Sequence, residues 1–183
     1  MTKQTENPLV QHLQRLAGED GERPPDRGAL AALRSSLARD RPLEALRVVL
    51  PAVAIGREVG DRERRAVEDS AVLLAQLYSL HPVSGERTLA SALRRSMSER
   101  DSDSIEGRFR ALLSAAREDL PAHLRHAVGL IASGGAGIDW TGLLRAIREW
   151  GRDDRRVQRA WARDFWAQEP ADDDPEPPAP PAA

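Results

Sequence analysis

The 183-residue sequence contains no cysteine and only one lysine, Lys3, and aromatic residues make up 4% of it. The absence of cysteine excludes disulfides and thiolate metal sites, which favours a cytoplasmic location. The longest apolar run, from Val48 to Ile55, is interrupted by Pro51 and is far shorter than the roughly 20 residues that span a bilayer. The first residues lack the apolar core of an export signal. We therefore expect neither membrane insertion nor export.

Alanine, leucine, arginine and glutamate dominate the composition, whereas β-branched residues are sparse and no segment alternates as a strand would. The sequence therefore predicts an all-α fold, a compact multi-helix bundle of two small helical subdomains within residues 1–169. Residues 170–183 are acidic and rich in proline, and are expected to form a disordered tail.

Apolar residues recur at helical spacing in several segments. Breaks are expected at Pro51 and before Pro121, because proline disrupts a continuing helix. Gly18 is expected to end the first helix, and Asp26 and Asp139 to cap the N-termini of two others. The helices are expected at 8–18, 26–37, 43–55 with its break, 61–80, 89–97, 104–133 with its break, 139–150 and 151–168.

The net charge of −2 conceals an uneven distribution. Asp172, Asp173, Asp174 and Glu176 lie in the tail, so residues 1–169 hold 27 basic and 25 acidic residues. A nearly neutral body cannot bind nucleic acid by bulk charge. It would have to gather arginines on one surface.

The segment from Gly151 to Gln168 has the pattern for such a surface. On one continuous helix its arginines would share a sector of roughly 100°, opposite Val157, Trp161 and Phe165. The pattern fits a solvated face, because aspartates flank it, equally as well as a phosphate-binding surface. The arginines concerned are Arg152, Arg155, Arg156, Arg159 and Arg163.

Residue patterns typical of catalysis are missing from the sequence, which disfavours an enzyme. Of four histidines only His123 and His126 are helical neighbours, and without a suitably spaced carboxylate they make a poor metal site. The glycines at 134–137 lack the Lys-Ser/Thr of a phosphate loop. Three tryptophans, Trp140, Trp150 and Trp161, are expected in the core, whereas Trp166 either packs beside the arginines or stacks on a base.

Seven segments of the sequence form a recognisable succession. They are DRGALAALR (26–34), LYSLHP (77–82), LASALRR (89–95), EGRFRALLSA (106–115), HLRHAV (123–128), IDWTGLLRAIREW (138–150) and RRVQRAWARDFW (155–166). Together they resemble the small subunit of the type I-E CRISPR Cascade complex, the CasB family. They follow the family's order between about residues 9 and 166, and the tail lies outside the resemblance.

The resemblance implies a non-catalytic, all-helical subunit without cofactor or metal. It implies partners as well: other Cascade subunits, a second copy of the chain, and the backbones of crRNA and target DNA, including the displaced strand, during R-loop formation in antiviral defence. About half of the arginines carried over by similarity are expected to touch phosphate. They are Arg27, Arg34, Arg94, Arg95, Arg108, Arg125, Arg145, Arg155, Arg156, Arg159 and Arg163.

Two other functions remain open from the residues alone. The chain could be a helical protein–protein scaffold whose arginines meet acidic protein surfaces, or a nuclease, which would need a carboxylate cluster that binds Mg²⁺. The acidic tail either aids solubility or occupies the basic face until DNA arrives.

Overall fold

The computed structural model describes residues 7–38, 41–56, 58–97 and 102–166. Within these ranges the chain forms nine α-helices and one 3₁₀-helix, and the only β pairing is an isolated parallel bridge between Ser84 and Ile138. The predicted all-α bundle is thus confirmed. None of the helices in these ranges combines the length and hydropathy that crossing a bilayer requires.

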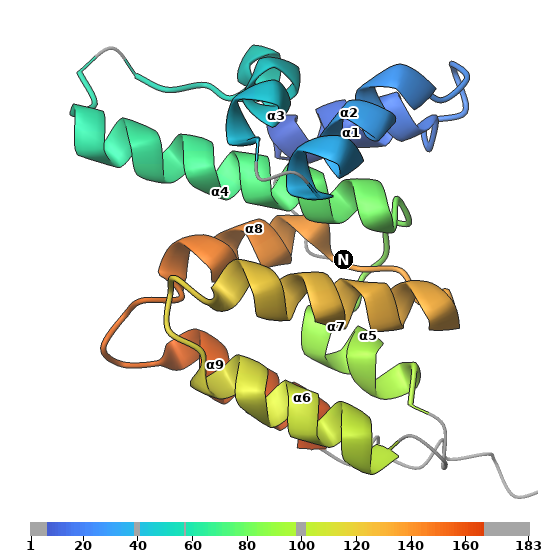
Figure 1. Ribbon diagram of the computed structural model, residues 1–183, viewed down its shortest axis with the longest axis vertical. Coiled ribbons are helices and arrows are strands. Elements are labelled where there is room, and N and C mark those ends of the chain that lie inside the picture. Colours follow the sequence, from blue (N-terminus) through green and yellow to red (C-terminus); the bar gives the residue numbers. More distant parts are fainter. Residues whose placement is uncertain (1–6, 39–40, 57, 98–101, 167–183) are drawn as a thin grey trace, which may run out of the picture.

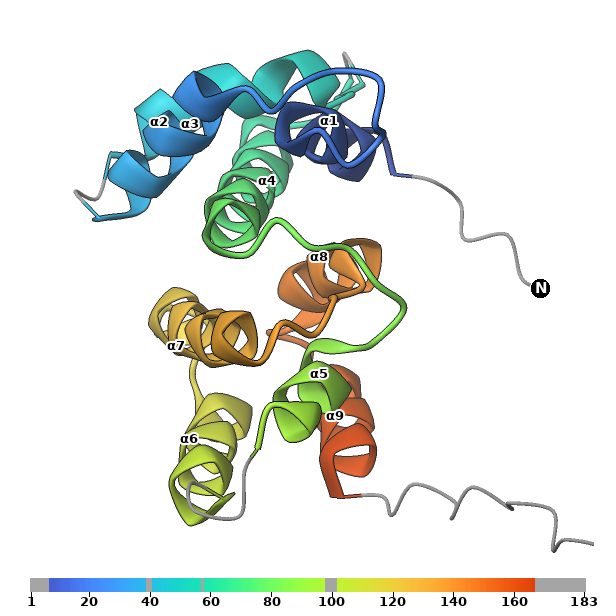
Figure 2. The ribbon, with the colours of Figure 1, turned by 90° about the vertical axis from the view of Figure 1, so that its right-hand side faces the viewer.

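The first helices form a layer that lies on one long helix, as Figures 1 and 2 show. This layer rests on α4, whose length lets it support all of the shorter helices. The layer consists of α1 (Pro8–Ala17), α2 (Arg27–Ala38), α3 (Pro42–Val49) and the 3₁₀-helix η1 (Leu50–Ala52), and the long helix below it is α4 (Asp61–Leu80).

The remaining helices form a second layer on the other side of α4. Two of them, α7 and α8, pack directly against α4, and α5, α6 and α9 lie farther from it (Figure 1). One continuous hydrophobic core joins the two layers, so they form a single bundle. The members of this layer are α5 (Leu89–Arg95), α6 (Ser102–Ser114), α7 (Leu120–Gly134), α8 (Trp140–Glu149) and α9 (Arg156–Trp166).

Several helix ends follow the capping chemistry of the sequence. The carboxylate of Asp26 accepts a hydrogen bond from the Ala29 amide at 2.9 Å, and that of Asp139 accepts one from the Gly142 amide at 2.8 Å. Gly18 ends α1 with a left-handed φ of 72°. Pro51 lies in η1, directly after α3 ends at Val49, which confirms the expected break.

Helix α4 passes from the surface into the core, as its sequence predicts. Its first nine residues, 61–69, are exposed or half-buried, and the stretch from Ser70 to Ser79 contains nearly all of its buried side chains. The helix ends at Leu80, before His81 and Pro82.

The two layers also meet through backbone, at a crossing of two glycines. The Gly85 amide donates to the Ile138 carbonyl at 3.0 Å, and the Ile138 amide donates to the Val83 carbonyl at 3.2 Å. A Cβ added at Gly137 would lie 2.5 Å from the Ser84 carbonyl oxygen, so a side chain there would collide with the facing backbone.

The structure corrects several expectations. Helix α9 begins at Arg156 rather than near Gly151, and α6 begins at Ser102, two residues before the expected start. Helix α5 ends at Arg95 rather than at residue 97, and the helical segment after Val49 ends at Ala52 rather than at residue 55. On α2, helical spacing predicts that Ala29 and Leu37 share the buried face of Leu30 and Leu33, but both are half-buried. The predicted tail at 170–183 and the end of the helical domain at residue 169 lie outside the described residues.

Candidate nucleic-acid interface

The outer face of α9 carries three arginines in a narrow sector. At 100° per residue, Arg156, Arg159 and Arg163 lie within about 60° of one another, and all three are exposed. The opposite face is buried: Trp161 packs on Trp150, which directly follows α8, with ring centroids 5.3 Å apart, and Val157 and Phe165 are buried with it. We call Arg156, Arg159 and Arg163 the α9 arginine face.

The expected five-arginine helix face was wrong in its first turn. Arg152 and Arg155 lie in the turn before α9, where Arg155 adopts a positive φ of 48° and donates through Nη2 to the Leu113 carbonyl at 2.6 Å. Arg152 lies 3.8 Å from the Asp154 carboxylate. The missed signal is Asp154, whose carboxylate accepts from the Arg156 amide at 3.3 Å, since aspartate is favoured just before a helix.

A groove of about 270 Å³ runs between α8 and α9 beside this face. Arg145 and Arg156 lie along it, together with Glu149 and Asp164. Glu149 forms an ion pair with Arg156 at 2.7 Å. The Arg156 side chain remains about half exposed, at 48%, so this pair contributes little and leaves the guanidinium accessible.

The carboxylate of Asp164 is engaged in a hydrogen bond within the fold. Its carboxylate accepts a hydrogen bond from the Thr88 hydroxyl at 2.8 Å, and the same hydroxyl accepts from the Ser91 amide at 3.3 Å and so caps α5. This acid therefore joins α9 to α5, which helps to hold the arginine face in place.

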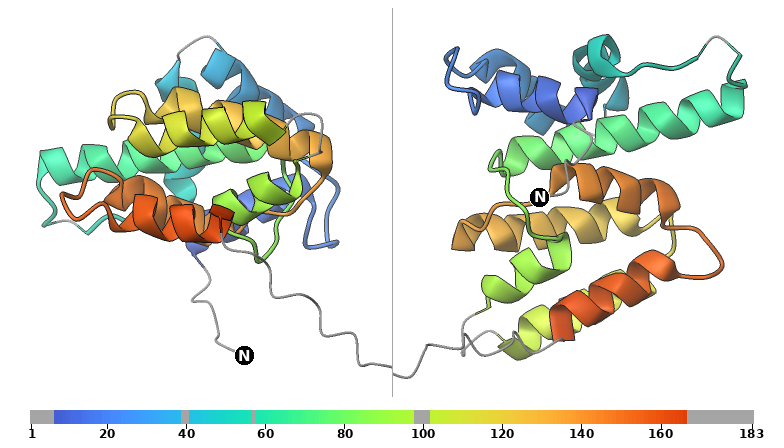
Figure 3. Two further views of the ribbon diagram at one scale, coloured as in Figure 1. Left: turned by 90° about the horizontal axis from the view of Figure 1, so that it is seen from below. Right: turned by 180° about the vertical axis from the view of Figure 1, so that it is seen from behind.

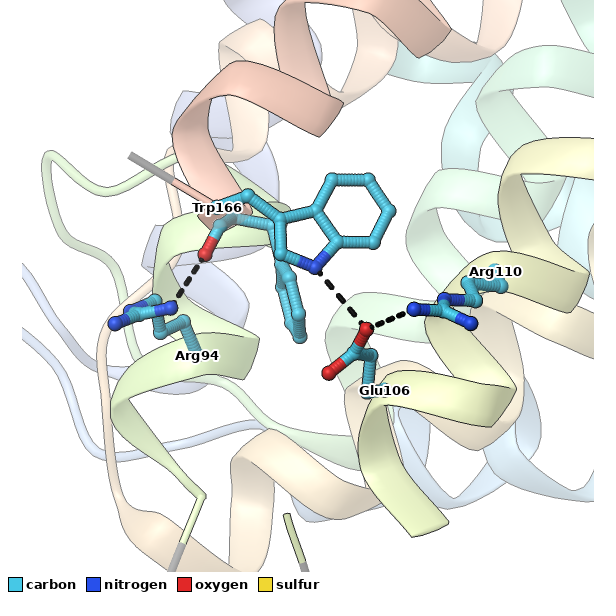
Figure 4. A network of polar contacts seen from close by, with 5 residues as sticks. Arg94, Glu106, Arg110 and Trp166 are labelled. Atoms are coloured by element: carbon cyan, nitrogen blue, oxygen red, sulfur yellow. Dashed lines mark hydrogen bonds and ion pairs between the residues drawn. The ribbon is translucent and has the colours of Figure 1, made fainter. Parts of the chain in front are cut away.

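The C-terminal end of α9 is fixed by α5 and α6, as Figure 4 shows. Arg94 of α5 donates to the Phe165 carbonyl at 2.8 Å. The Trp166 indole N–H donates to Glu106 of α6 at 3.3 Å, and Glu106 also binds Arg110. The Trp166 ring contacts Phe109 and Phe165 edge-on, so Trp166 packs at the end of this helix although 41% of it is exposed.

A second cavity, of about 410 Å³, lies between α6 and α7. Arg108, His123 and His126 line it together with apolar side chains that include Phe109 and Leu130. Arg125 of α7 is exposed. Among the described residues no group of three or more histidines, aspartates or glutamates is arranged to hold a metal ion.

The two predicted arginines on α2 lie far from α9, in the other layer (Figure 1). Arg34 donates through Nε to the Ser79 carbonyl of α4 at 2.7 Å, and both Arg27 and Arg34 are exposed. The structure therefore does not gather all eleven predicted arginines on one surface.

Within the described chain, the predicted arginines divide by their contacts. Arg34, Arg94 and Arg155 bind backbone carbonyls and Arg156 binds Glu149. The side chains of the others form no hydrogen bond or ion pair with described residues, and these are Arg27, Arg95, Arg108, Arg125, Arg145, Arg159 and Arg163.

The fold and the α9 face define a class: a helical protein that displays exposed guanidinium groups on a helix whose other side is buried in the core. Comparison with known proteins gives the family. The sequence model of the family CRISPR-associated protein Cse2 matches residues 29–166, and the chain belongs to this family.

Relatives of known sequence and structure agree with this assignment. CRISPR-associated protein Cse2 of Thermus thermophilus is 36% identical over 140 residues, which are 75% of this chain and 78% of the relative. The crystal structure of CasB from Thermus thermophilus matches with a TM-score of 0.68 and 34% identity, over 87% of this chain and 96% of that chain.

A further structural match comes from a larger assembly. One chain in a structure of a CRISPR RNA-guided surveillance complex matches with a TM-score of 0.58 and 26% identity, over 87% of this chain and 93% of that chain. The resemblance to the CasB family seen in the sequence is thereby confirmed.

Proposed function

We propose that this chain is a non-catalytic, nucleic-acid-binding subunit of a type I-E Cascade ribonucleoprotein in the cytoplasm. Its partners are other Cascade subunits, a second copy of itself, and the backbones of crRNA and target DNA. Its role is to stabilise guide, target and displaced strands while the R-loop forms. Membership of the Cse2 family and the match within a surveillance complex support this proposal.

The observation that carries the proposal is the α9 arginine face. Arg159 and Arg163 form no ion pair with described residues, and Arg156 is only partly compensated by Glu149. Guanidinium groups aligned on one helix suit a phosphate backbone, because each group donates several hydrogen bonds in a fixed fork.

Backbone contact is sufficient for such a subunit. In an RNA-guided complex, base pairing with the guide reads the sequence, so the protein can hold the strands through phosphates alone. The exposed Arg145 beside the α8–α9 groove would extend this contact.

The test replaces Arg156, Arg159 and Arg163 together with alanine in the assembled complex, and measures target binding as a function of salt. If all three arginines contact phosphates of a single strand, the slope of log K against log salt becomes shallower by about two units. Arg155 is left intact because its bond to Leu113 supports the fold.

A matched control removes the same charge elsewhere. Arg23, Arg62 and Arg65 are exposed and none belongs to the predicted site, so their triple alanine variant should bind as the wild type does. An unchanged salt slope in the α9 variant, or equal losses in both variants, would refute the assignment of the α9 face.

One observation favours the alternative, a protein–protein scaffold without nucleic-acid contact. Leu43 of α3 is 77% exposed and Leu50 of η1 is 45% exposed, and large apolar side chains displayed in this way are typical of protein contacts. In this case Leu43→Ser would prevent assembly with partner subunits, and the α9 variant would leave target binding intact.

A further inference from the structure

The segment after Trp166 lies outside the part of the chain that matches the family. The family match ends at residue 166, and residues 167–183 lie beyond it. These seventeen residues contain five acids, six prolines and neither lysine nor arginine. The acids are Glu169, Asp172, Asp173, Asp174 and Glu176.

The point where this segment leaves the fold is well defined. Arg94 holds the Phe165 carbonyl, and Glu106 holds the Trp166 indole (Figure 4). Trp166 also contacts Phe109 and Phe165, whose rings stack with centroids 4.0 Å apart. The acidic segment therefore starts from a fixed position next to α5 and α6.

Exposed arginines surround this position. Arg163 lies one turn before the end of α9 and Arg159 one turn earlier, and Arg95 directly follows Arg94, which binds the end of α9. Seen from behind in Figure 3, α9 lies on the outside of the bundle with α5 beside it. None of these three arginine side chains has a hydrogen bond or ion pair with described residues.

The acids can reach these arginines. Arg159 lies seven residues before Trp166, about 10 Å along α9 at 1.5 Å per residue. Proline-rich sequence favours an extended backbone of about 3.1 Å per residue, so Asp172, six residues after Trp166, can lie up to about 19 Å from it. A segment that turns back along α9 thus brings its aspartates next to Arg163 and Arg159.

We propose that residues 169–176 dock on Arg95, Arg159 and Arg163 of the same chain and compete there with nucleic-acid phosphate. The competition rests on the function proposed above, but the docking does not. Attachment to the chain gives the acids a high effective concentration at these arginines, so contacts that are individually weak suffice to occupy them.

Docking is tested without nucleic acid. The chain has no cysteine, so an Ala179→Cys variant carries a single nitroxide label. Its paramagnetic broadening should affect the amides of Arg159 and Arg163 strongly and those of α2 little. Changing the five tail acids to their amides should abolish the selective broadening, whereas changing five tail prolines to serine should preserve it. Broadening that is uniform, or that survives removal of the acids, would overturn docking.

Competition is tested by truncation after Trp166, with single-stranded DNA as the probe. The truncated chain should bind roughly tenfold more tightly at low salt, and the difference should vanish at high salt because salt screens both contacts. The acid-to-amide variant should match the truncated chain. Equal affinity of the full and truncated chains would overturn the competition. If neither chain binds DNA, it is the proposed function that fails, and the nitroxide result still decides docking.

Discussion

Tyr78 joins distant parts of the chain through its ring and its hydroxyl group. Its ring is fully buried and packs edge-on against Trp140 at 5.0 Å, and its hydroxyl donates to Glu19 at 2.8 Å. Glu19 also accepts from the backbone amide and the hydroxyl of Ser84, at 2.7 and 2.6 Å. Burial, reinforced by the hydrogen bond and the charge of Glu19, raises the pKa of Tyr78 above its ordinary value.

This shift predicts a loss of stability in alkali. Because the folded chain holds the phenolic proton more tightly than the unfolded chain, the contribution is complete below about pH 10 and is lost as the pH rises further. The free energy of unfolding should fall by about 1.4 kcal/mol per pH unit above that point. Denaturant titrations between about pH 9 and pH 12 measure it.

The composition leaves few other side chains that titrate in this pH range. Tyr78 is the only tyrosine, Lys3 the only lysine, and cysteine is absent. Tyr78→Phe should be less stable near neutral pH by about 1.5–3 kcal/mol, through loss of a hydrogen bond to a charged group, but its stability should change little in alkali. A variant as alkali-sensitive as the wild type would disprove the role of Tyr78.

Residue-level prediction from sequence worked where burial decides the outcome. Trp140, Trp150 and Trp161 are at most 6% exposed, as their helical spacing indicated. Prediction from the sequence failed where the position of a side chain depends on a distant hydrogen-bond partner. Nothing in the spacing shows that Arg94 binds Phe165, or that Glu19 binds Tyr78 fifty-nine residues away, because these contacts depend on how the helices pack.

At the scale of the element, α9 has two roles on opposite sides: one side packs into the core and the other displays arginines. Trp161 is 6% exposed on the buried side, whereas Trp166 is 41% exposed at the end. Trp161→Ala should lower the free energy of unfolding by about 3–5 kcal/mol, because it removes a large side chain from the core. Trp166→Ala should cost at most about 2 kcal/mol, since much of the ring is already in water.

Denaturant unfolding of the two tryptophan variants checks this order. Equal losses in the free energy of unfolding would mean that the buried apolar side of α9 does not anchor this helix in the fold. The arginine face should be unaffected in Trp166→Ala, so DNA binding by this variant provides a separate check.

Element boundaries show what a pattern alone can establish. The limits of α4 agree with the sequence because its polar start and its His-Pro end are strong local signals. The start of α9 was misplaced because Arg152 and Arg155 fit the helical period equally well. The turn is formed instead by a left-handed Arg155 and by its bond to Leu113, and periodicity carries no information on either.

At the scale of the molecule, the crossing of Gly85 and Gly137 couples the two layers. Gly137→Ala would place a Cβ 2.5 Å from the Ser84 carbonyl oxygen and 3.0 Å from the Gly85 Cα. The backbone segments around Gly85 and Gly137 must therefore move apart. We expect a loss of about 3 kcal/mol in the free energy of unfolding.

Gly129→Ala is the matched control, because Gly129 lies in α7 with open space around its Cβ position. This variant should be stabilised by up to about 1 kcal/mol, the helix-propensity gain of alanine over glycine. Thermal unfolding of both variants should remain a single transition, because α4 packs against both layers and the core is continuous. A Gly137→Ala chain as stable as the wild type would show that the crossing is not tight.

The surface-to-core course of α4 also has an evolutionary consequence. Residues 61–69 extend the helix without a fully buried side chain, so substitutions there should seldom affect folding. Selection on this stretch can then follow whatever it touches, whereas packing constrains residues 70–79. We therefore expect the exposed half of this helix to tolerate more sequence change than the buried half.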